Sequence, residues 1–217
     1  MRTFMITDLY FLLYAAGWTV IITLVSFCFG GILGLAIALA KLFGGKIPRL
    51  IATAFVELLQ STPVLMLLFL SFYGLNYLGF RLPPFIAAGA ALSLFAGAFL
   101  GEIWRGSIEA IEKSQWEASE ALAMTRFQQC RYIIFPQAIR IALAPTIGFL
   151  AQLIKNTSIA ALIGFVEITR AGQILNNMTF QPFLIFSLVA VIYFVICYPL
   201  SAYSQRLEEK LNASRSA

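Results

Sequence analysis

The amino-acid sequence predicts an all-α integral membrane protein with five transmembrane helices, and two observations lead to this fold class. Hydrophobic residues make up 60% of the 217 residues, and charged residues make up only 12%. Soluble domains usually carry about 25% charged residues, so the charged side chains here are too few to cover a water-exposed surface. The charged residues are also unevenly distributed, and they leave several uncharged stretches long enough to cross a bilayer as helices.

The first two predicted spans are residues 10–40 and 50–73. The first is longer than the ~20 residues of a direct crossing, so this helix should tilt or begin in the interface. Gly30 and Gly34 have the spacing that lets another helix approach closely, although loose packing around them fits the sequence equally well. Pro63 lies inside the second span and should kink or break that helix.

The remaining predicted spans are residues 83–104, 141–166 and 182–205. The third begins at two prolines, which a first helical turn tolerates. The uncharged part of the fourth, residues 141–154, is only about 21 Å long at 1.5 Å per residue, which is shorter than the ~30 Å hydrocarbon core. Continuing it to residue 166 completes the crossing and places Lys155 within the membrane.

The Lys and Arg residues predict the orientation. Five crossings leave three of the 15 basic residues on one side and eleven on the other, with Lys155 between them. Cytoplasmic loops are enriched in Lys and Arg, so residues 1–9 should lie outside and the tail, residues 207–217, in the cytoplasm. Without the fourth crossing, the basic C-terminal tail would lie on the opposite side.

Residues 105–140 form a long, charged connection between the third and fourth spans. Most helix connections are far shorter, so this one should have structure of its own. Ser114 and Glu117 have the spacing of a capping box at a helix N-terminus. Pro136 should bias Phe135 away from helical geometry, so that the helix stops there and a second segment begins. The apolar side chains of this region suit docking into a groove, although packing on its own subunit is equally compatible; they are Trp116, Leu122 and Phe127.

The connection also contains a recognisable motif. Glu117-Ala118-Ser119, followed by Ala123 and by Ile133-Ile134-Phe135-Pro136, resembles the E-A-A…G…I-x-L-P loop of ABC importer permeases. Ser119 replaces the second Ala, Ala123 the usual Gly and Phe135 the Leu, all changes that preserve close packing. Because Ala carries a Cβ, we expect that a glycine-dependent turn does not form at Ala123.

Four flanking motifs look like those of the polar amino acid branch, which includes histidine, glutamine, glutamate and arginine permeases. The similarity covers essentially residues 10–210, with the motifs in family order. It implies a type I ABC importer (MetI-like) fold for residues 10–206 and a place in the bacterial inner membrane. The motifs are Gln60-Ser61-Thr62-Pro63, Glu102-Ile103-Trp104-Arg105-Gly106, Lys113-Ser114-Gln115-Trp116-Glu117-Ala118 and Lys155-Asn156-Thr157-Ser158.

The resemblance implies the pore-forming subunit of an ATP-driven importer for polar amino acids. Such a subunit pairs with itself or a similar permease, binds two ATP-binding cassette ATPase subunits and receives the amino acid from a soluble binding protein. ATP and Mg²⁺ would bind the ATPase, so the chain itself should be no enzyme and hold no cofactor. The loop would couple ATP hydrolysis to the pore through Glu117, Ala118, Ser119, Ala123 and Pro136.

Polar groups at membrane depth are candidates for the substrate pathway, because placing them there is costly. Lys155 is the strongest, since a cation can receive the carboxylate that every amino acid carries; alternatively it snorkels to the interface or neutralises Glu57 or Glu102. Glu57 faces the pathway or pairs with Lys41 or Arg49. The further candidates are Asn156, Thr157 and Ser158, which could equally bond neighbouring helices, and Gln60.

Glu102 and Arg105 lie three residues apart on one helix face, where they can pair. Structural anchoring explains such a pair better than gating does.

Several other function classes are disfavoured. The chain has no histidine, and it shows neither a metal-ligand cluster nor a nucleophile elbow, so a membrane enzyme or a metal site is not expected. Gly44-Gly45-Lys46 lacks the Ser or Thr of a P-loop. The positive charge follows the cytoplasmic side rather than a nucleic-acid surface. Two alternatives remain, a secondary amino acid transporter driven by an ion gradient, although no internal repeat is evident, and a non-transporting membrane assembly subunit.

Overall fold

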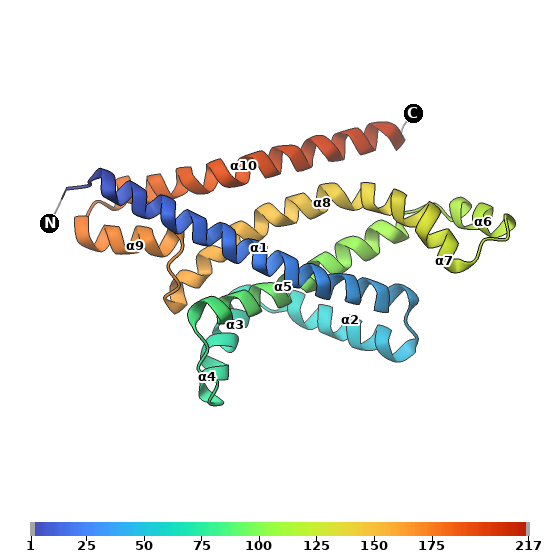
Figure 1. Ribbon diagram of the computed structural model, residues 1–217, viewed down its shortest axis with the longest axis horizontal. Helices are drawn as coiled ribbons and strands as arrows, with labels where there is room; N and C mark the ends of the chain where they lie inside the picture. The colour runs from blue at the N-terminus through green and yellow to red at the C-terminus, as the bar shows by residue number, and fades with distance from the viewer. Residues whose placement is uncertain (1–2, 216–217) are drawn as a thin grey trace.

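The computed structural model describes residues 3–215, and in that part of the chain it contains helices and connections without a strand (Figure 1). The predicted all-α class is confirmed. A 3₁₀ helix covers Thr157–Ile163, and π-helical turns cover Leu70–Gly74 and Gln129–Ile134. The α-helices are α1 (Ile6–Phe43), α2 (Lys46–Ser61), α3 (Val64–Phe69), α4 (Leu75–Tyr77), α5 (Pro84–Glu109), α6 (Lys113–Ala121), α7 (Arg126–Gln128), α8 (Phe135–Asn156), α9 (Ile168–Thr179) and α10 (Pro182–Arg215).

Four helical stretches in the described part of the chain are long and apolar enough to cross a membrane. They are Ile6–Phe43, Pro84–Glu109, Arg126–Ile163 and Pro182–Leu211. A fifth crossing is possible if the pair Lys46–Ser61 and Val64–Tyr77 counts as one broken span, although its two halves meet at 103°. The break falls at Pro63, as predicted, because proline cannot donate the backbone hydrogen bond that a continuous helix needs.

The helices α1 and α5 pack together along glycines on both surfaces. A Cβ on Gly30 would lie 2.5 Å from the Cβ of Ala96, and a Cβ on Gly97 would lie 2.7 Å from the Leu33 side chain. Such distances leave no room for a methyl group. The spacing of Gly30 and Gly34 therefore marks a close helix contact, and the alternative of loose packing is wrong.

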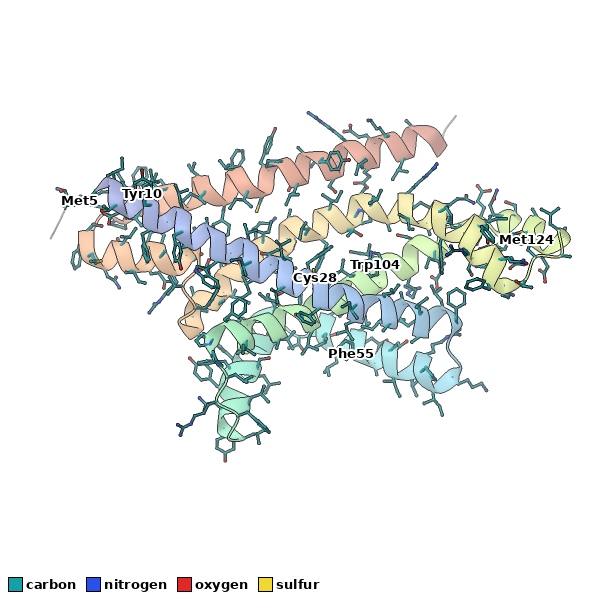
Figure 2. The ribbon with its side chains drawn as sticks, viewed as in Figure 1. Met5, Tyr10, Cys28, Phe55, Trp104 and Met124 are labelled. Atoms are coloured by element: carbon teal, nitrogen blue, oxygen red, sulfur yellow. The ribbon has the colours of Figure 1, made fainter. Side chains whose placement is uncertain are left out.

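A second interface joins α5 to α8 and α8 to α10. The rings of Phe99 and Phe149 stack with centroids 5.6 Å apart. The Trp104 indole N–H donates to the Thr146 hydroxyl over 3.1 Å, and Figure 2 shows Trp104 between these helices. On the other side of α8, the Ser204 hydroxyl donates to the Ala144 carbonyl over 2.6 Å. The helix α8 is thus held from two sides.

One helix was not predicted from the sequence. The segment before the last span contains α9, which packs against α1 and α10. It ends at Phe180, whose left-handed backbone (φ 54°) turns the chain before Pro182 starts α10. Because nothing between residues 171 and 205 is charged, the hydropathy pattern alone does not separate these two helices.

The outer surfaces of α1 and α10 carry large exposed apolar side chains. Water-soluble monomers rarely expose a large contiguous apolar surface, whereas hydrocarbon or a second membrane subunit accepts it. The predicted contact with membrane lipid agrees with this surface. Examples are Phe29, Ile32, Val191, Phe194 and Val195.

Candidate functional site

The loop with α6 and α7 lies at one end of the molecule, away from α9 at the other end (Figure 1). The helix α5 continues to Glu109 and a further helical stretch begins at Arg126, so both helices extend into the predicted connection 105–140. One expectation about this connection needs correction. The chain does not leave helical geometry at Phe135 (φ −61°, ψ −41°). Pro136 lies where the π-helical turn Gln129–Ile134 passes into α8, and the changed hydrogen-bond spacing of such a turn can accommodate its missing N–H.

The predicted capping box at Ser114 is also absent. The N-cap of α6 is Glu112, two residues earlier, and the Ser114 hydroxyl donates to the Glu112 carboxylate over 3.1 Å. A capping box occurs instead at Thr125, where the Gln128 side chain accepts from the Thr125 backbone N–H over 2.8 Å. Both positions have a Ser or Thr followed three residues later by Glu or Gln, so the spacing alone does not distinguish them.

The end of α6 contradicts the expectation for Ala123. Its backbone is left-handed, with φ +56°. The Ala123 N–H donates to the Glu120 carbonyl over 2.9 Å, and the Met124 N–H donates to the Ser119 carbonyl over 3.2 Å. This pair of bonds is the Schellman motif, which normally places glycine at the left-handed position. The glycine-type turn therefore forms with alanine, at a steric cost of about 1–2 kcal/mol.

The loop is firmly attached to α8. Ser119 is fully buried and donates to the Trp116 carbonyl over 2.7 Å. The buried side chain of Gln129 donates to the Met124 carbonyl over 3.1 Å, and Figure 2 shows Met124 in this protruding loop. A small apolar cluster joins the two parts underneath, with Trp116 packed against Ile111, Ile134 and Ala138.

The outer surface of the same loop is apolar and open. The side chains of Leu122 and Phe127 are 73% and 74% exposed. Glu117 and Ala118 are exposed beside them, whereas Ser119 is not. The guanidinium of Arg126 lies 5.9 Å from the centre of the Trp116 ring. The loop thus presents apolar and charged groups on a rigid base, which is a surface suited to a protein partner.

The polar residues predicted for the pathway follow one another at the end of α8. Lys155 is exposed, Asn156 and Ser158 are half-buried, and Thr157 is buried. Asn156 accepts a hydrogen bond from Gln152 over 3.1 Å, and the Ser158 hydroxyl donates to the Lys155 carbonyl over 2.7 Å. We call residues 155–158 the polar belt. Because an exposed lysine in a lipid-facing position is costly, this face requires water or a second subunit beside it.

Neither Lys155 nor Glu57 forms an ion pair within the described residues. Glu57 and Gln60 are exposed on α2, and the Gln60 amide donates to the Ala98 carbonyl over 3.4 Å. The expected alternatives, in which Lys155 neutralises Glu57 or Glu102, are therefore not seen. The helix α3, just after Gln60, packs against the 3₁₀ helix that begins at Thr157.

Glu102 lies instead in a cluster of charges between α1 and α5. It pairs with Lys41 at the end of α1, and its other oxygen accepts from Arg105 over 2.6 and 2.9 Å. Arg105 also pairs with Glu109, and Arg49 donates to the Lys41 carbonyl over 3.0 Å. The pairing of Glu57 with Lys41 or Arg49 is thus wrong, because both cations are engaged here.

Glu167 is fully buried and forms the N-cap of α9, and it was not among the residues predicted from the sequence. Its carboxylate accepts from the Arg170 and Thr169 N–H groups over 2.8 and 2.9 Å, and from the Tyr193 hydroxyl over 2.6 Å. Burial raises the pKa of Glu167, and these hydrogen bonds oppose that rise. The available signal was an acidic residue just before a helix, which is favourable at a helix N-terminus.

Comparison with known proteins gives consistent similarities. Residues 30–213 match the family described as binding-protein-dependent transport system inner membrane component. The probable amino-acid ABC transporter permease YckA of Bacillus subtilis (strain 168) is 35% identical over 194 residues, covering 89% of this chain and 86% of the relative. The glutamine transport system permease GlnP of Escherichia coli (strain K12) is 34% identical over 202 residues, with 92% of each chain covered.

Solved structures extend the likeness to the fold. A crystal structure of an amino acid ABC transporter with histidines superposes with a TM-score of 0.89 at 30% identity, covering 97% of this chain and 100% of the other. An inward-facing MetNI methionine ABC transporter superposes with a TM-score of 0.77 at 21% identity, covering 92% and 95%.

Proposed function

The chain belongs to the family of inner-membrane components of binding-protein-dependent transport systems, and from that premise we propose that it is the pore-forming subunit of an ATP-driven importer for polar amino acids. It has the MetI-like type I importer fold and is a multi-pass membrane protein. The amino acid cargo is supported by the relatives, since YckA is described as a probable amino-acid permease and GlnP as a glutamine permease.

One observation carries the mechanism. A continuous helical stretch, Arg126–Ile163, begins in the exposed loop and contains the polar belt near its other end. Because α6 is attached to this helix by buried contacts, a force on Leu122 or Phe127 acts on Lys155 at the other end. Movement of a rigid helix is an established way of coupling distant sites. The loop is thus the part on which a motor acts, and the belt is the part that the motor moves.

The proposed assembly contains two such permeases, identical or similar, with two ATP-binding cassette ATPase subunits bound to their loops. ATP and Mg²⁺ bind to the ATPases, and a soluble binding protein delivers the amino acid on the opposite side. The excess of Lys and Arg on the loop side supports a cytoplasmic loop and C-terminus and an outer N-terminus. The second permease also covers the polar belt, which a lone subunit leaves exposed.

In the transport step, Lys155 receives the carboxylate of the amino acid, and Asn156 and Ser158 offer hydrogen-bonding groups beside it. A charge-assisted hydrogen bond suits this role because it weakens when water enters the path. ATP-driven movement of the loop then exposes the belt alternately to the two sides. Glu57 and Gln60 on α2 are further groups that can line this path.

The test uses the permease reconstituted in proteoliposomes with its ATPase and its amino-acid-loaded binding protein. Phe127→Ala or Glu117→Lys should lower amino acid uptake per ATP hydrolysed while leaving the amount of permease in the membrane unchanged. Phe183→Ala is the matched control, because Phe183 is 89% exposed at the other end of the molecule. Uptake at the wild-type rate in the loop variants, or uptake that needs an ion gradient and no ATP, would contradict the proposal.

A further inference from the structure

Three helices, α1, α9 and α10, meet through hydrogen bonds around Glu167. The carboxylate belongs to the start of α9, and Tyr193 reaches it from α10. The Thr19 hydroxyl of α1 accepts from the Ile168 N–H over 3.3 Å, next to the carboxylate. The Tyr193 hydroxyl also shares a hydrogen bond with the Thr169 hydroxyl over 3.2 Å. The start of α9, held by this network, comes shortly after the 3₁₀ helix that begins in the polar belt at Thr157.

The path of the chain keeps Glu167 close to the 3₁₀ helix. The 3₁₀ helix that starts at Thr157 ends at Gly164, whose left-handed backbone (φ +86°) turns the chain back. The Phe165 N–H then donates to the Ala160 carbonyl over 3.2 Å. This tight turn sets Glu167 beside the helix that it has just left. Thr157 itself is fully buried, with 0% of its surface accessible to solvent.

Capping α9 does not by itself require this arrangement. A Ser, Thr, Asp or Asn at the surface satisfies the same N–H groups. Burying a carboxylate is costly unless it is fully hydrogen-bonded, and here the third bond comes from a tyrosine on another helix. Buried polar networks of this kind hold their members in a single geometry when every group is satisfied. The network therefore constrains the position of the 3₁₀ helix relative to α9 and α10.

We propose that Glu167 and Tyr193 are positioning residues, which hold the 3₁₀ helix so that Lys155, Asn156 and Ser158 meet the transported amino acid in one fixed geometry. Neither residue contacts the amino acid. The expected effect on substrate affinity rests on the proposed transport function. The positioning of the 3₁₀ helix by Glu167 and Tyr193 does not depend on that function. Small displacements of binding groups are costly for function, so loss of the network should weaken substrate affinity without removing the protein from the membrane.

The first experiment measures amide hydrogen exchange in the full-length wild type and in Tyr193→Phe, in the assembled complex. This substitution keeps the ring and removes only the hydroxyl. We expect exchange of residues 157–163 to rise at least about threefold, because their local opening becomes easier. Tyr203→Phe is the matched control, since Tyr203 lies on the same helix and is 55% exposed. A network that only caps α9 predicts faster exchange at Thr169 and Arg170 and none at 157–163, and that pattern overturns the proposal.

The second experiment measures uptake in proteoliposomes. Tyr193→Phe should raise the KM for the amino acid at least about threefold with a smaller change in kcat. If the KM is unchanged although amide hydrogen exchange at residues 157–163 is faster, the network does not influence substrate binding, and that part of the proposal is overturned. If the wild-type complex takes up no amino acid, the proposed function fails, and the exchange result alone still decides whether the network holds the segment.

Discussion

Gly34 on α1 and Gly101 on α5 are in direct backbone contact: a Cβ on Gly34 would lie 2.9 Å from the Gly101 amide nitrogen. The same Cβ would lie 3.1 Å from the Gly97 carbonyl oxygen. Both neighbours are backbone atoms, which cannot move aside as the end of a flexible side chain can. Association of helices inside a membrane depends on such close packing, because lipid supplies no hydrophobic driving force between them.

Gly34→Ala should therefore destabilise the protein by about 1–3 kcal/mol, the usual cost of overpacking. The measurement is thermal unfolding of the purified full-length chain in detergent. Gly17→Ala is the matched control on the same helix, where an added Cβ has no neighbour within 4 Å. There the change should be neutral or slightly stabilising, because alanine favours the helix. Equal effects at the two positions would mean that the α1–α5 contact is looser than the structure has it.

Glu102→Gln should lower stability through the charge cluster. The carboxylate lies between Lys41 and Arg105, and the neutral amide leaves two partly buried cations facing each other. Loss of such a charge-assisted partner costs about 1–3 kcal/mol. The change is measured as a lower unfolding temperature, with Glu120→Gln on the exposed surface of α6 as the control. An unfolding temperature equal to that of the control would show that the cluster does not join α1 to α5.

Ala123→Gly should stabilise the end of α6, because glycine adopts the left-handed conformation without steric cost. The gain is at most about 1 kcal/mol, since glycine also gains freedom in the unfolded chain. Hydrogen exchange at the Met124 amide should slow by the corresponding factor. Ala123→Val should do the opposite, because a β-branched residue is strained at this φ. Faster exchange in the glycine variant would show that Ala123 does not occupy a left-handed turn.

Lys155→Met should weaken the binding of the transported amino acid while leaving assembly unchanged. Removing a charge-assisted bond to a carboxylate costs about 1.5–3 kcal/mol, which corresponds to roughly a 10- to 150-fold rise in KM. Uptake by the reconstituted complex measures this change. Lys46→Met, at an exposed position at the start of α2, controls for the loss of a charge elsewhere. A variant that assembles and transports with the normal KM would remove Lys155 from the pathway.

The sequence predicted the membrane-crossing helices well, because hydropathy sums over about 20 residues and averages out local detail. Pro63 likewise acted as predicted, since the missing N–H is a property of the residue itself. The loop was less predictable. The capping box belongs to Thr125 rather than Ser114, and Pro136 lies within a helical path. Ser114 and Thr125 both satisfy the spacing rule for a capping box, and the π-helical turn before Pro136 keeps the chain helical.

The sequence by itself determined that this chain is a helical membrane protein and that a charged loop separates two of its long apolar helices. These properties follow from the transfer of each residue between water and hydrocarbon, which needs no knowledge of its neighbours. Only the tertiary structure decided which polar groups meet. In the structure, Lys41 pairs with Glu102, and Tyr193 donates a hydrogen bond to Glu167. Lys155 forms no ion pair with an acidic residue in the described part of the chain. Such pairings depend on the relative position of helices distant in sequence, and backbone contacts such as that of Gly34 with Gly101 set that position.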